Sequence, residues 1–180
     1  MRRASLAFGL LTLAMAAHGQ QQQPARFGAS VSAYYISDSR LRDAFGNPAL
    51  TYGVNASALS RPRANKPTFA YNVLTATKGD SKFFLVPFTI GYEKQLGDRL
   101  TAKTLPYARV EAGYAYYDVA IHDGSYNQSF KTGGFTAGAE AGIIFNRSLG
   151  LKARYNLFQD RFGVDLSGVQ VGVTYNFFSL

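Results

Sequence analysis

The feature that most restricts the fold of this 180-residue chain is a repeated alternation of apolar and polar residues. It is clearest in residues 169–177, where Val, Val, Val, Tyr and Phe alternate with Gln, Gly, Thr and Asn. Successive side chains of a β-strand point to opposite faces, so this pattern predicts a strand with one apolar and one polar face. No helical period follows residue 19, and the sequence therefore predicts an all-β protein.

Eight blocks of about ten residues show the same alternation, and segments rich in turn-forming residues separate them. The predicted strands are 27–35, 50–58, 69–77, 84–92, 105–117, 135–145, 149–157 and 169 to the end of the chain. The predicted connections are 36–49, 60–67, 78–81, 97–99, 122–132, 146–148 and 159–165. Consecutive strands joined in this way predict an eight-stranded antiparallel up-and-down β-barrel.

The apolar face of these strands carries most of its aromatic residues near the strand ends, and Tyr71 and Phe88 are exceptions. Two rings of aromatic residues around an aliphatic middle are typical of membrane-spanning barrels. The predicted rings contain Phe27, Tyr35, Tyr52, Phe69, Phe84, Tyr92, Tyr114, Tyr116, Phe135, Phe145 and Tyr155. We therefore expect the apolar face to contact outer-membrane lipids. The alternative is a soluble exported barrel that binds an apolar ligand inside.

The N-terminus predicts export from the cytoplasm. Residues 1–19 combine a basic start, an apolar run at 4–17 and small residues around a cleavage site, which is the pattern of a secretory signal peptide. The apolar run is shorter than the roughly 20 residues that a membrane-spanning helix needs. We predict a signal peptide at 1–19, a disordered polar leader at 20–25 and a barrel at 26–180. The expected location is the outer membrane of a diderm bacterium.

Composition excludes several kinds of site. The chain has no Cys, and His122 is the single histidine after the signal segment, so no metal site and no cofactor are predicted. The net charge is +8, and removal of Arg2 and Arg3 with the signal segment leaves about +6. A basic chain can bind nucleic acid, but export and the scattered positions of the basic residues argue against that partner. Anionic lipid head groups are the expected partner.

The polar face carries five charged residues on the predicted strands 105–117, 135–145 and 149–157. They are Arg109, Glu111, Glu140, Lys152 and Arg154. Charges inside a membrane protein must be paired or hydrated, so we expect a ladder of salt bridges across neighbouring strands. An eight-stranded barrel is just wide enough to be filled by side chains. The alternatives are a narrow conduit for small solutes or ions and a ligand site.

An enzyme remains a weaker alternative. His122 lies near Asp118, Asp123, Ser125 and Ser129 in the sequence, and such residues can support acyl transfer or hydrolysis. No specific catalytic motif accompanies them, and Asp, Gly, Ser and Asn are ordinary loop residues. We therefore predict a polar surface loop and no enzymatic activity.

Two predicted loops are the candidates for contact with a surface ligand, because function commonly resides in loops on a rigid barrel. The first is 36–49 and the second is 122–132. The residues that we expect them to present are Asp38, Arg40, Arg42, Asp43, His122 and Asp123.

The last strand contains Gln170, Gly172, Tyr175 and Phe177, and this spacing resembles the C-terminal signal strand of bacterial outer-membrane barrels. The chain runs to Leu180, three residues past the aromatic on which that family usually ends. With its signal segment, eight strands and aromatic rings, the chain resembles small outer-membrane barrels of the OmpA/OmpX type. The resemblance implies recognition by the barrel assembly machinery. It also implies a monomer without a periplasmic domain that serves envelope structure or surface interaction.

Overall fold

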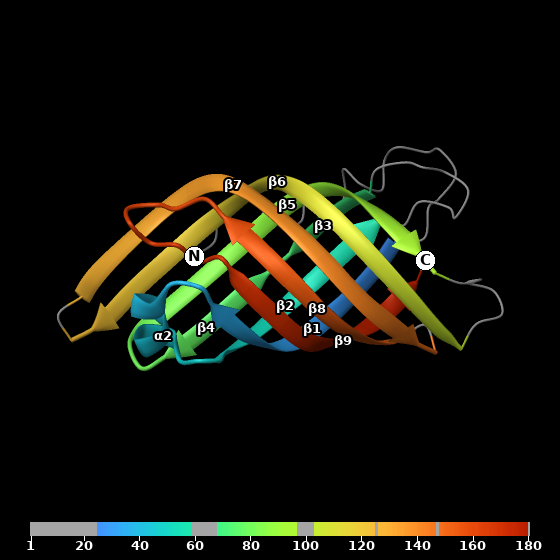
Figure 1. Ribbon diagram of the computed structural model, residues 1–180, viewed down its shortest axis with the longest axis horizontal. Helices are drawn as coiled ribbons and strands as arrows, with labels where there is room; N and C mark the ends of the chain where they lie inside the picture. The colour runs from blue at the N-terminus through green and yellow to red at the C-terminus, as the bar shows by residue number, and fades with distance from the viewer. Residues whose placement is uncertain (1–24, 59–67, 97–102, 125, 147, 180) are drawn as a thin grey trace.

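The computed structural model describes residues 25–58, 68–96, 103–124, 126–146 and 148–179 as one closed barrel (Figure 1). Its strands are β1 (Ala25–Ile36), β2 (Ala49–Ala58), β3 (Thr68–Asn72), β4 (Leu74–Lys78), β5 (Ser81–Gln95), β6 (Thr104–Asp123), β7 (Tyr126–Phe145), β8 (Leu149–Phe158) and β9 (Gly168–Ser179). One short helix, α2 (Ser39–Phe45), lies between β1 and β2.

All neighbouring strands pair antiparallel, and β1 pairs with both β2 and β9, which closes the sheet. Both β3 and β4 lie between β2 and β5, so together they form one strand of the barrel. The prediction of an eight-stranded antiparallel barrel is therefore confirmed. Among the described residues, no helix is long and apolar enough to cross a membrane.

The third barrel strand is interrupted at Val73, which the sequence did not predict. The Val73 amide donates a hydrogen bond to the Val54 carbonyl oxygen at 2.8 Å, outside the regular ladder. The Val73 carbonyl oxygen approaches Gly53 so closely that a Cβ atom at Gly53 would clash with it. The absence of a side chain at Gly53 therefore permits the interruption.

The outward face of the barrel is apolar, as its sequence pattern predicts. Nine of the eleven predicted ring aromatics are exposed, and Phe27 and Phe145 are half-buried. Aliphatic residues such as Val31, Val110 and Leu151 are also about half exposed. In water such a continuous apolar surface would be unfavourable, whereas lipid tails are a suitable solvent for it.

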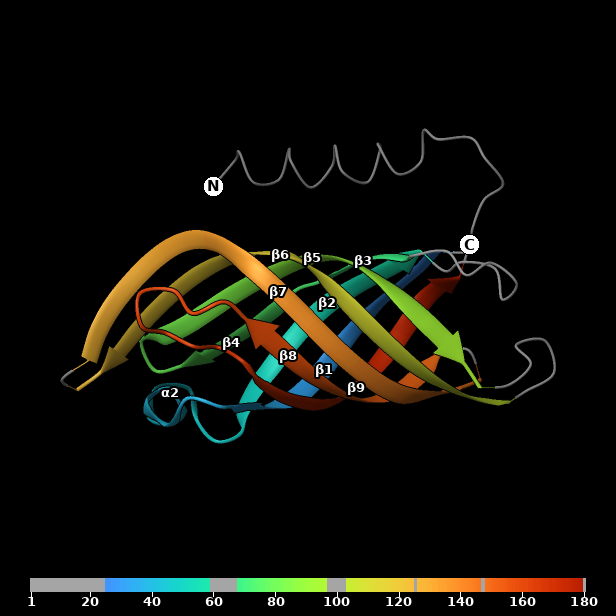
Figure 2. The same cartoon turned by 45° about the horizontal axis from the view of Figure 1, so that its top comes forward.

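The barrel has two distinct ends. The helix end, as we call it, holds α2, the 79–80 turn, the tip of the β6–β7 hairpin and the segment 159–167. The turn end lies opposite and is named for the short turn 146–148 between β7 and β8. Figures 1 and 2 show that the β6–β7 hairpin projects beyond the other strands at the helix end.

The prediction of a loop at 122–132 is wrong, because most of these residues belong to the β6–β7 hairpin. Strands β6 and β7 pair continuously from Thr104 and Phe145 to Asp123 and Tyr126. Gly124 adopts a φ of 51° at the turn, a conformation that glycine tolerates well. Consequently His122 and Asp123 lie at the end of β6 and not in a long loop.

The prediction of no helix beyond the signal segment is also wrong. In α2, the side chain of Asp38 caps the N-terminus by accepting a hydrogen bond from the Arg40 amide at 3.0 Å. Ala44 and Phe45 lie three and four residues after Leu41, so they share one face of the helix with it, and all three are buried. Figure 2 shows α2 at the mouth of the barrel.

The expectation of a polar face throughout the interior is correct only toward the turn end. At the helix end the interior is a packed apolar cluster, because both faces of β5 and β6 are apolar there. Its buried members are Tyr34, Ile36, Leu41, Ala44, Phe45, Ala49, Leu74, Ala76, Phe83, Leu85, Ala115, Tyr117, Val119, Ile121, Phe158, Val164 and Leu166.

Several predictions concern residues outside the described part of the chain. The predicted signal peptide at 1–19 and the leader through residue 24 are among them, as are the connections 60–67 and 97–99. Strand β1 begins at Ala25, one residue before the predicted start of the barrel.

Candidate functional site

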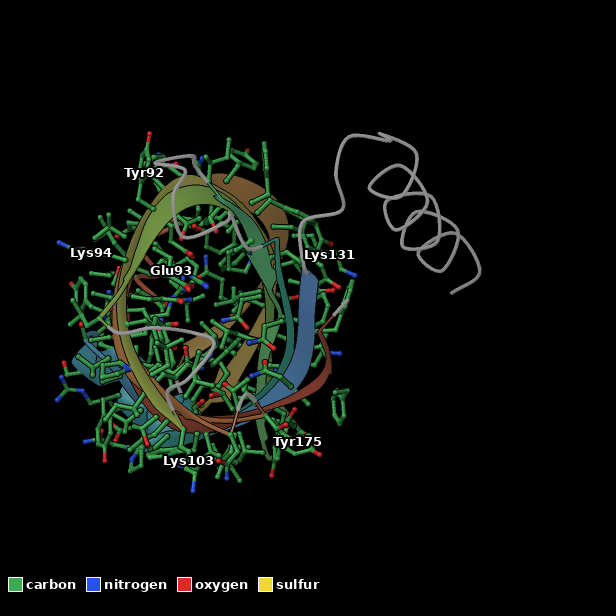
Figure 3. The ribbon with its side chains drawn as sticks, turned by 90° about the vertical axis from the view of Figure 1, so that its right-hand side faces the viewer. Tyr92, Glu93, Lys94, Lys103, Lys131 and Tyr175 are labelled. Carbon is green, nitrogen blue, oxygen red and sulfur yellow. The ribbon has the colours of Figure 1, made fainter. Side chains whose placement is uncertain are left out.

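The lumen toward the turn end holds a network of six charged side chains. Five were predicted, and the sixth is Glu93 on β5, which was missed because the predicted strand stopped at residue 92. Figure 3 shows Glu93 pointing into the lumen while its neighbours Tyr92 and Lys94 lie outside the wall. Continuing the alternation of β5 by one residue identifies Glu93 as inward-facing. The network then contains three cations and three carboxylates, which balance.

Strand register brings opposite charges together in this network. In the strand register, Arg109 on β6 lies opposite Glu140 on β7, and Glu140 lies opposite Arg154 on β8. Arg154 Nη2 lies 2.5 Å from Glu111 Oε1, and Arg154 Nη1 lies 3.6 Å from Glu140 Oε2. Arg109 Nη2 lies 2.5 Å from Glu93 Oε2. Both guanidinium groups are therefore held by carboxylates from other strands, and the contact of Arg154 with Glu111 reaches from β8 past β7 to β6.

Neutral side chains extend the network across the lumen. The Tyr107 hydroxyl donates to Glu140 Oε1 at 2.8 Å, and Arg154 Nε donates to Asn156 Oδ1 at 2.6 Å. Gln170 Nε2 donates to Ser32 Oγ at 3.0 Å, which joins β9 to β1. These links between strands stiffen this part of the barrel.

A small polar cavity of about 50 Å³ adjoins this network. Asn55, Asn72, Lys152 and Thr174 are among the residues that line it. Within the described residues, neither polar side-chain atom of Asn72 has a hydrogen-bond partner, and the same holds for Thr174 Oγ1. Buried polar groups of this kind are usually satisfied by water, and the cavity has room for only a few water molecules.

The lumen is filled at the helix end. The Phe45 ring of α2 meets the Phe83 ring edge to face, with centroids 5.0 Å apart. The Tyr34 hydroxyl donates to the Leu166 carbonyl oxygen at 2.5 Å. Helix α2 and the segment 159–167 therefore pack onto the barrel wall as a plug with the character of a protein core.

Polar contacts tie the elements at the helix end into one surface, which we call the cap surface. It comprises α2, the tip of the β6–β7 hairpin and the segment 159–167. Arg40 Nη2 donates to the Gly163 carbonyl oxygen at 2.8 Å, and Lys78 Nζ donates to the Asp43 carbonyl oxygen at 2.7 Å. Hydrogen bonding to Arg40 lowers the pKa of Asp38, so the helix cap is charged at neutral pH.

Phe162 is the most exposed large apolar side chain of the described residues, at 66%. Its ring contacts Phe130 on β7, with centroids 5.2 Å apart, and its carbonyl oxygen accepts a hydrogen bond from Gln128. Phe162 and Gly163 have φ values of 59° and 75° in a two-residue turn closed by Arg161 and Val164. Such turns favour Asn, Asp and Gly, so an aromatic residue here is unusual.

The residues around His122 do not form a catalytic constellation in the described part of the chain. Ser81 Oγ contacts only backbone atoms of His122, accepting from its amide at 2.8 Å and donating to its carbonyl oxygen at 3.0 Å. The Asp118 carboxylate forms an ion pair with Lys131 at 2.9 Å. Ser125 lies outside the described residues. The contacts of Ser81 and Asp118 hold neighbouring strands together at the hairpin.

The residues of the predicted assembly signal lie on β9, which pairs with β8 and β1 and closes the barrel. Gln170 is buried in the lumen, whereas Tyr175 and Phe177 are exposed on the outward face, with ring centroids 5.3 Å apart. A Cβ atom at Gly172 would clash with Ser32 of β1. Recognition of this strand by assembly machinery stays a prediction.

Comparison with known proteins agrees with this geometry. The family model described as "Outer membrane protein beta-barrel domain" matches residues 4–177. No curated protein sequence matches the chain. The structure is similar to the N-terminal β-barrel domain of Pseudomonas aeruginosa OprF, with 16% identity, coverage of 88% of this chain and 100% of that chain, and a TM-score of 0.57.

Two further solved barrels are similar. Neisserial surface protein A has 15% identity, coverage of 86% of this chain and 96% of that chain, and a TM-score of 0.55. The outer membrane enzyme PagL has 11% identity, coverage of 83% of this chain and 97% of that chain, and a TM-score of 0.54. At these identities the likeness concerns the fold alone. The match of the family model to nearly the whole chain shows that this protein belongs to the outer membrane protein β-barrel domain family.

Proposed function

We propose that this outer-membrane barrel has no enzymatic activity and presents its cap surface at the cell exterior, for contact with surface ligands or for envelope structure. The observation that carries the proposal is the plug at the helix end, where the apolar face of α2 joins the buried cluster and hydrogen bonds join the outer segments. A filled lumen does not favour transport, and a rigid outer surface suits recognition.

The proposed orientation rests on the β6–β7 hairpin at the helix end and the 146–148 turn at the opposite end, although the 79–80 turn at the helix end is also short. Outer-membrane barrels commonly have long extracellular loops and short periplasmic turns. The β6–β7 hairpin extends past β8, whose pairing with β7 begins only at Thr136 and Phe158. The turn 146–148 at the opposite end is short. We therefore assign the helix end to the exterior and the turn end to the periplasm.

A conduit for small solutes or ions is the second candidate, and the polar cavity beside Lys152 favours it. That cavity is only about 50 Å³, and the apolar plug separates it from the helix end. Ions cross apolar, dry constrictions poorly. A conducting state would require α2 to leave the lumen and expose Leu41 and Phe45.

An enzyme is less well supported. The likeness to PagL is a likeness of fold, and one fold hosts many functions. Within the described residues, no hydrogen bond joins the His122 side chain to Ser129 or Asp118, and Asp118 is engaged by Lys131. The contacts on this hairpin are those of a structural element.

Labelling of intact cells tests the presentation of the cap surface. The chain has no cysteine, so Asp80→Cys at the helix end and Lys103→Cys at the turn end each introduce a single thiol. Both positions are exposed. We expect a membrane-impermeant maleimide to label Asp80→Cys on intact cells and to label Lys103→Cys only after the outer membrane is opened. The reverse pattern would contradict the proposed orientation, and equal labelling in a soluble periplasmic fraction would contradict membrane insertion.

A further inference from the structure

We propose that the outward rim at the turn end, centred on Lys94 and Lys103, binds the head groups of anionic phospholipids in the inner leaflet of the outer membrane. This inference rests on the proposed orientation of the barrel. It concerns a surface distinct from both the lumen and the cap surface.

Charge is divided unevenly between the two ends of the barrel. Outside the lumen, the described residues at the turn end include Lys94 and Lys103 and no acidic residue. The connections at the helix end contain three basic and five acidic residues. Among the described residues, the turn end is therefore the more positive of the two ends, since the charges of the lumen balance.

The two ends also differ in whether any of their described basic side chains outside the lumen form ion pairs. At the helix end, Arg40 pairs with Asp38 at 2.7 Å and Lys131 pairs with Asp118 at 2.9 Å. At the turn end, Lys94 and Lys103 are exposed, and neither forms an ion pair within 4.0 Å among the described residues. Two cations near the membrane surface are thus available for an anion from outside the chain.

The direction of these side chains indicates where that anion lies. Lys94 follows Tyr92 on the outward face of β5, and Figure 3 shows both on the outside of the barrel wall. Lys103 precedes β6 and also lies at the periphery in this view, and its carbonyl oxygen accepts a hydrogen bond from the Asn146 amide at 2.9 Å.

Tyr92 is an aromatic residue of the kind found at the membrane interface, and Lys94 lies just beyond it on the same face. This arrangement places the Lys94 ammonium group at the level of the lipid phosphates. A soluble periplasmic polymer would instead approach along the barrel axis. The lateral direction of Lys94 therefore favours a lipid head group. Basic residues near a membrane surface attract anionic lipids, with a contribution that corresponds to roughly fivefold in affinity for each residue.

Native mass spectrometry of the detergent-purified full chain can test this site with an equimolar mixture of phosphatidylglycerol and phosphatidylcholine. We expect the wild-type protein to retain phosphatidylglycerol preferentially. The double variant Lys94→Gln/Lys103→Gln should lose at least roughly fivefold of that preference, because two unpaired cations are removed. The matched control is Lys82→Gln/Lys131→Gln, which removes the same charge at the helix end and should keep the preference. A heat-dependent gel shift shows that each variant is folded.

Three results would overturn the proposal. The wild-type protein could retain both lipids equally, or the two double variants could lose the preference to the same extent, which would indicate a general charge effect. Soluble peptidoglycan fragments could displace phosphatidylglycerol from the wild-type protein, which would make a periplasmic polymer the partner. Lipid preference in detergent does not depend on orientation, whereas thiol labelling on cells does. Failure of this inference and failure of the proposed function are therefore distinguishable.

Discussion

Replacement of Arg154 by methionine is expected to lower the free energy of unfolding by about 3–5 kcal/mol. Arg154 is almost fully buried and contacts Glu111, Glu140 and Asn156. Its removal leaves two buried carboxylates with too little compensating charge, and an uncompensated buried charge costs more than an intact ion pair contributes. Urea unfolding in detergent, followed by the heat-dependent gel shift and by circular dichroism, measures the change.

A double variant separates this effect from a simple loss of packing. Arg154→Met/Glu111→Gln removes one of the carboxylates that Arg154 neutralises, so it should be more stable than Arg154→Met alone. If the single variant loses less than about 1 kcal/mol, the network is hydrated and contributes as little as pairs on a protein surface do. That result would contradict the description of the lumen as a closed, cross-linked interior.

Replacement of Phe45 by alanine is expected to cost about 3–5 kcal/mol, because it leaves a cavity in the plug. Phe45 is 4% exposed and packs on Phe83. Phe162→Ala is the matched control, since the same atoms are removed from a side chain that is 66% exposed, and its effect should be about 0.5 kcal/mol or less. The same urea titration applies to both variants. Equal effects of the two substitutions would show that α2 is not seated in the lumen.

The outward face was predicted well because the membrane restricts it most strongly. Every second residue of a spanning strand must be apolar, and this requirement produces the alternation that locates all eight strands. It also determines which residues face inward. The inward positions of Arg109, Glu140 and Arg154 therefore follow from the sequence once the strands are placed.

The wrong predictions concern residues outside the membrane-spanning part of the strands, where alternate residues need not be apolar. Residues 122–132 extend beyond the apolar band, so both faces of the hairpin are polar and the sequence resembles a loop. Helix α2 has only seven residues. The spacing of Leu41, Ala44 and Phe45 covers too few turns to distinguish a helix from a loop in the sequence. Glu93 was missed because the predicted strand ended at residue 92, before the polar run Glu93, Lys94 and Gln95 that β5 includes.

The division of the interior into a polar half and an apolar half was not predicted, although part of the signal is present in the sequence. In β6, residues 114–121 are apolar on both faces apart from Asp118, which indicates a strand buried on one side and in contact with lipid on the other. What fills such an interior depends on contacts between segments far apart in the chain. The contact of Phe45 with Phe83, or of Tyr34 with Leu166, cannot be read from local patterns.

Single-channel recording in a planar lipid bilayer tests the central claim, that the barrel is closed at its helix end. We predict that the purified wild-type protein, shown to be inserted by its heat-dependent gel shift, produces no stepwise conductance. The reason is that α2 and the apolar cluster fill the lumen above a cavity of about 50 Å³. Reproducible conductance steps from the wild-type protein would contradict the claim and would make the conduit the better account of its function.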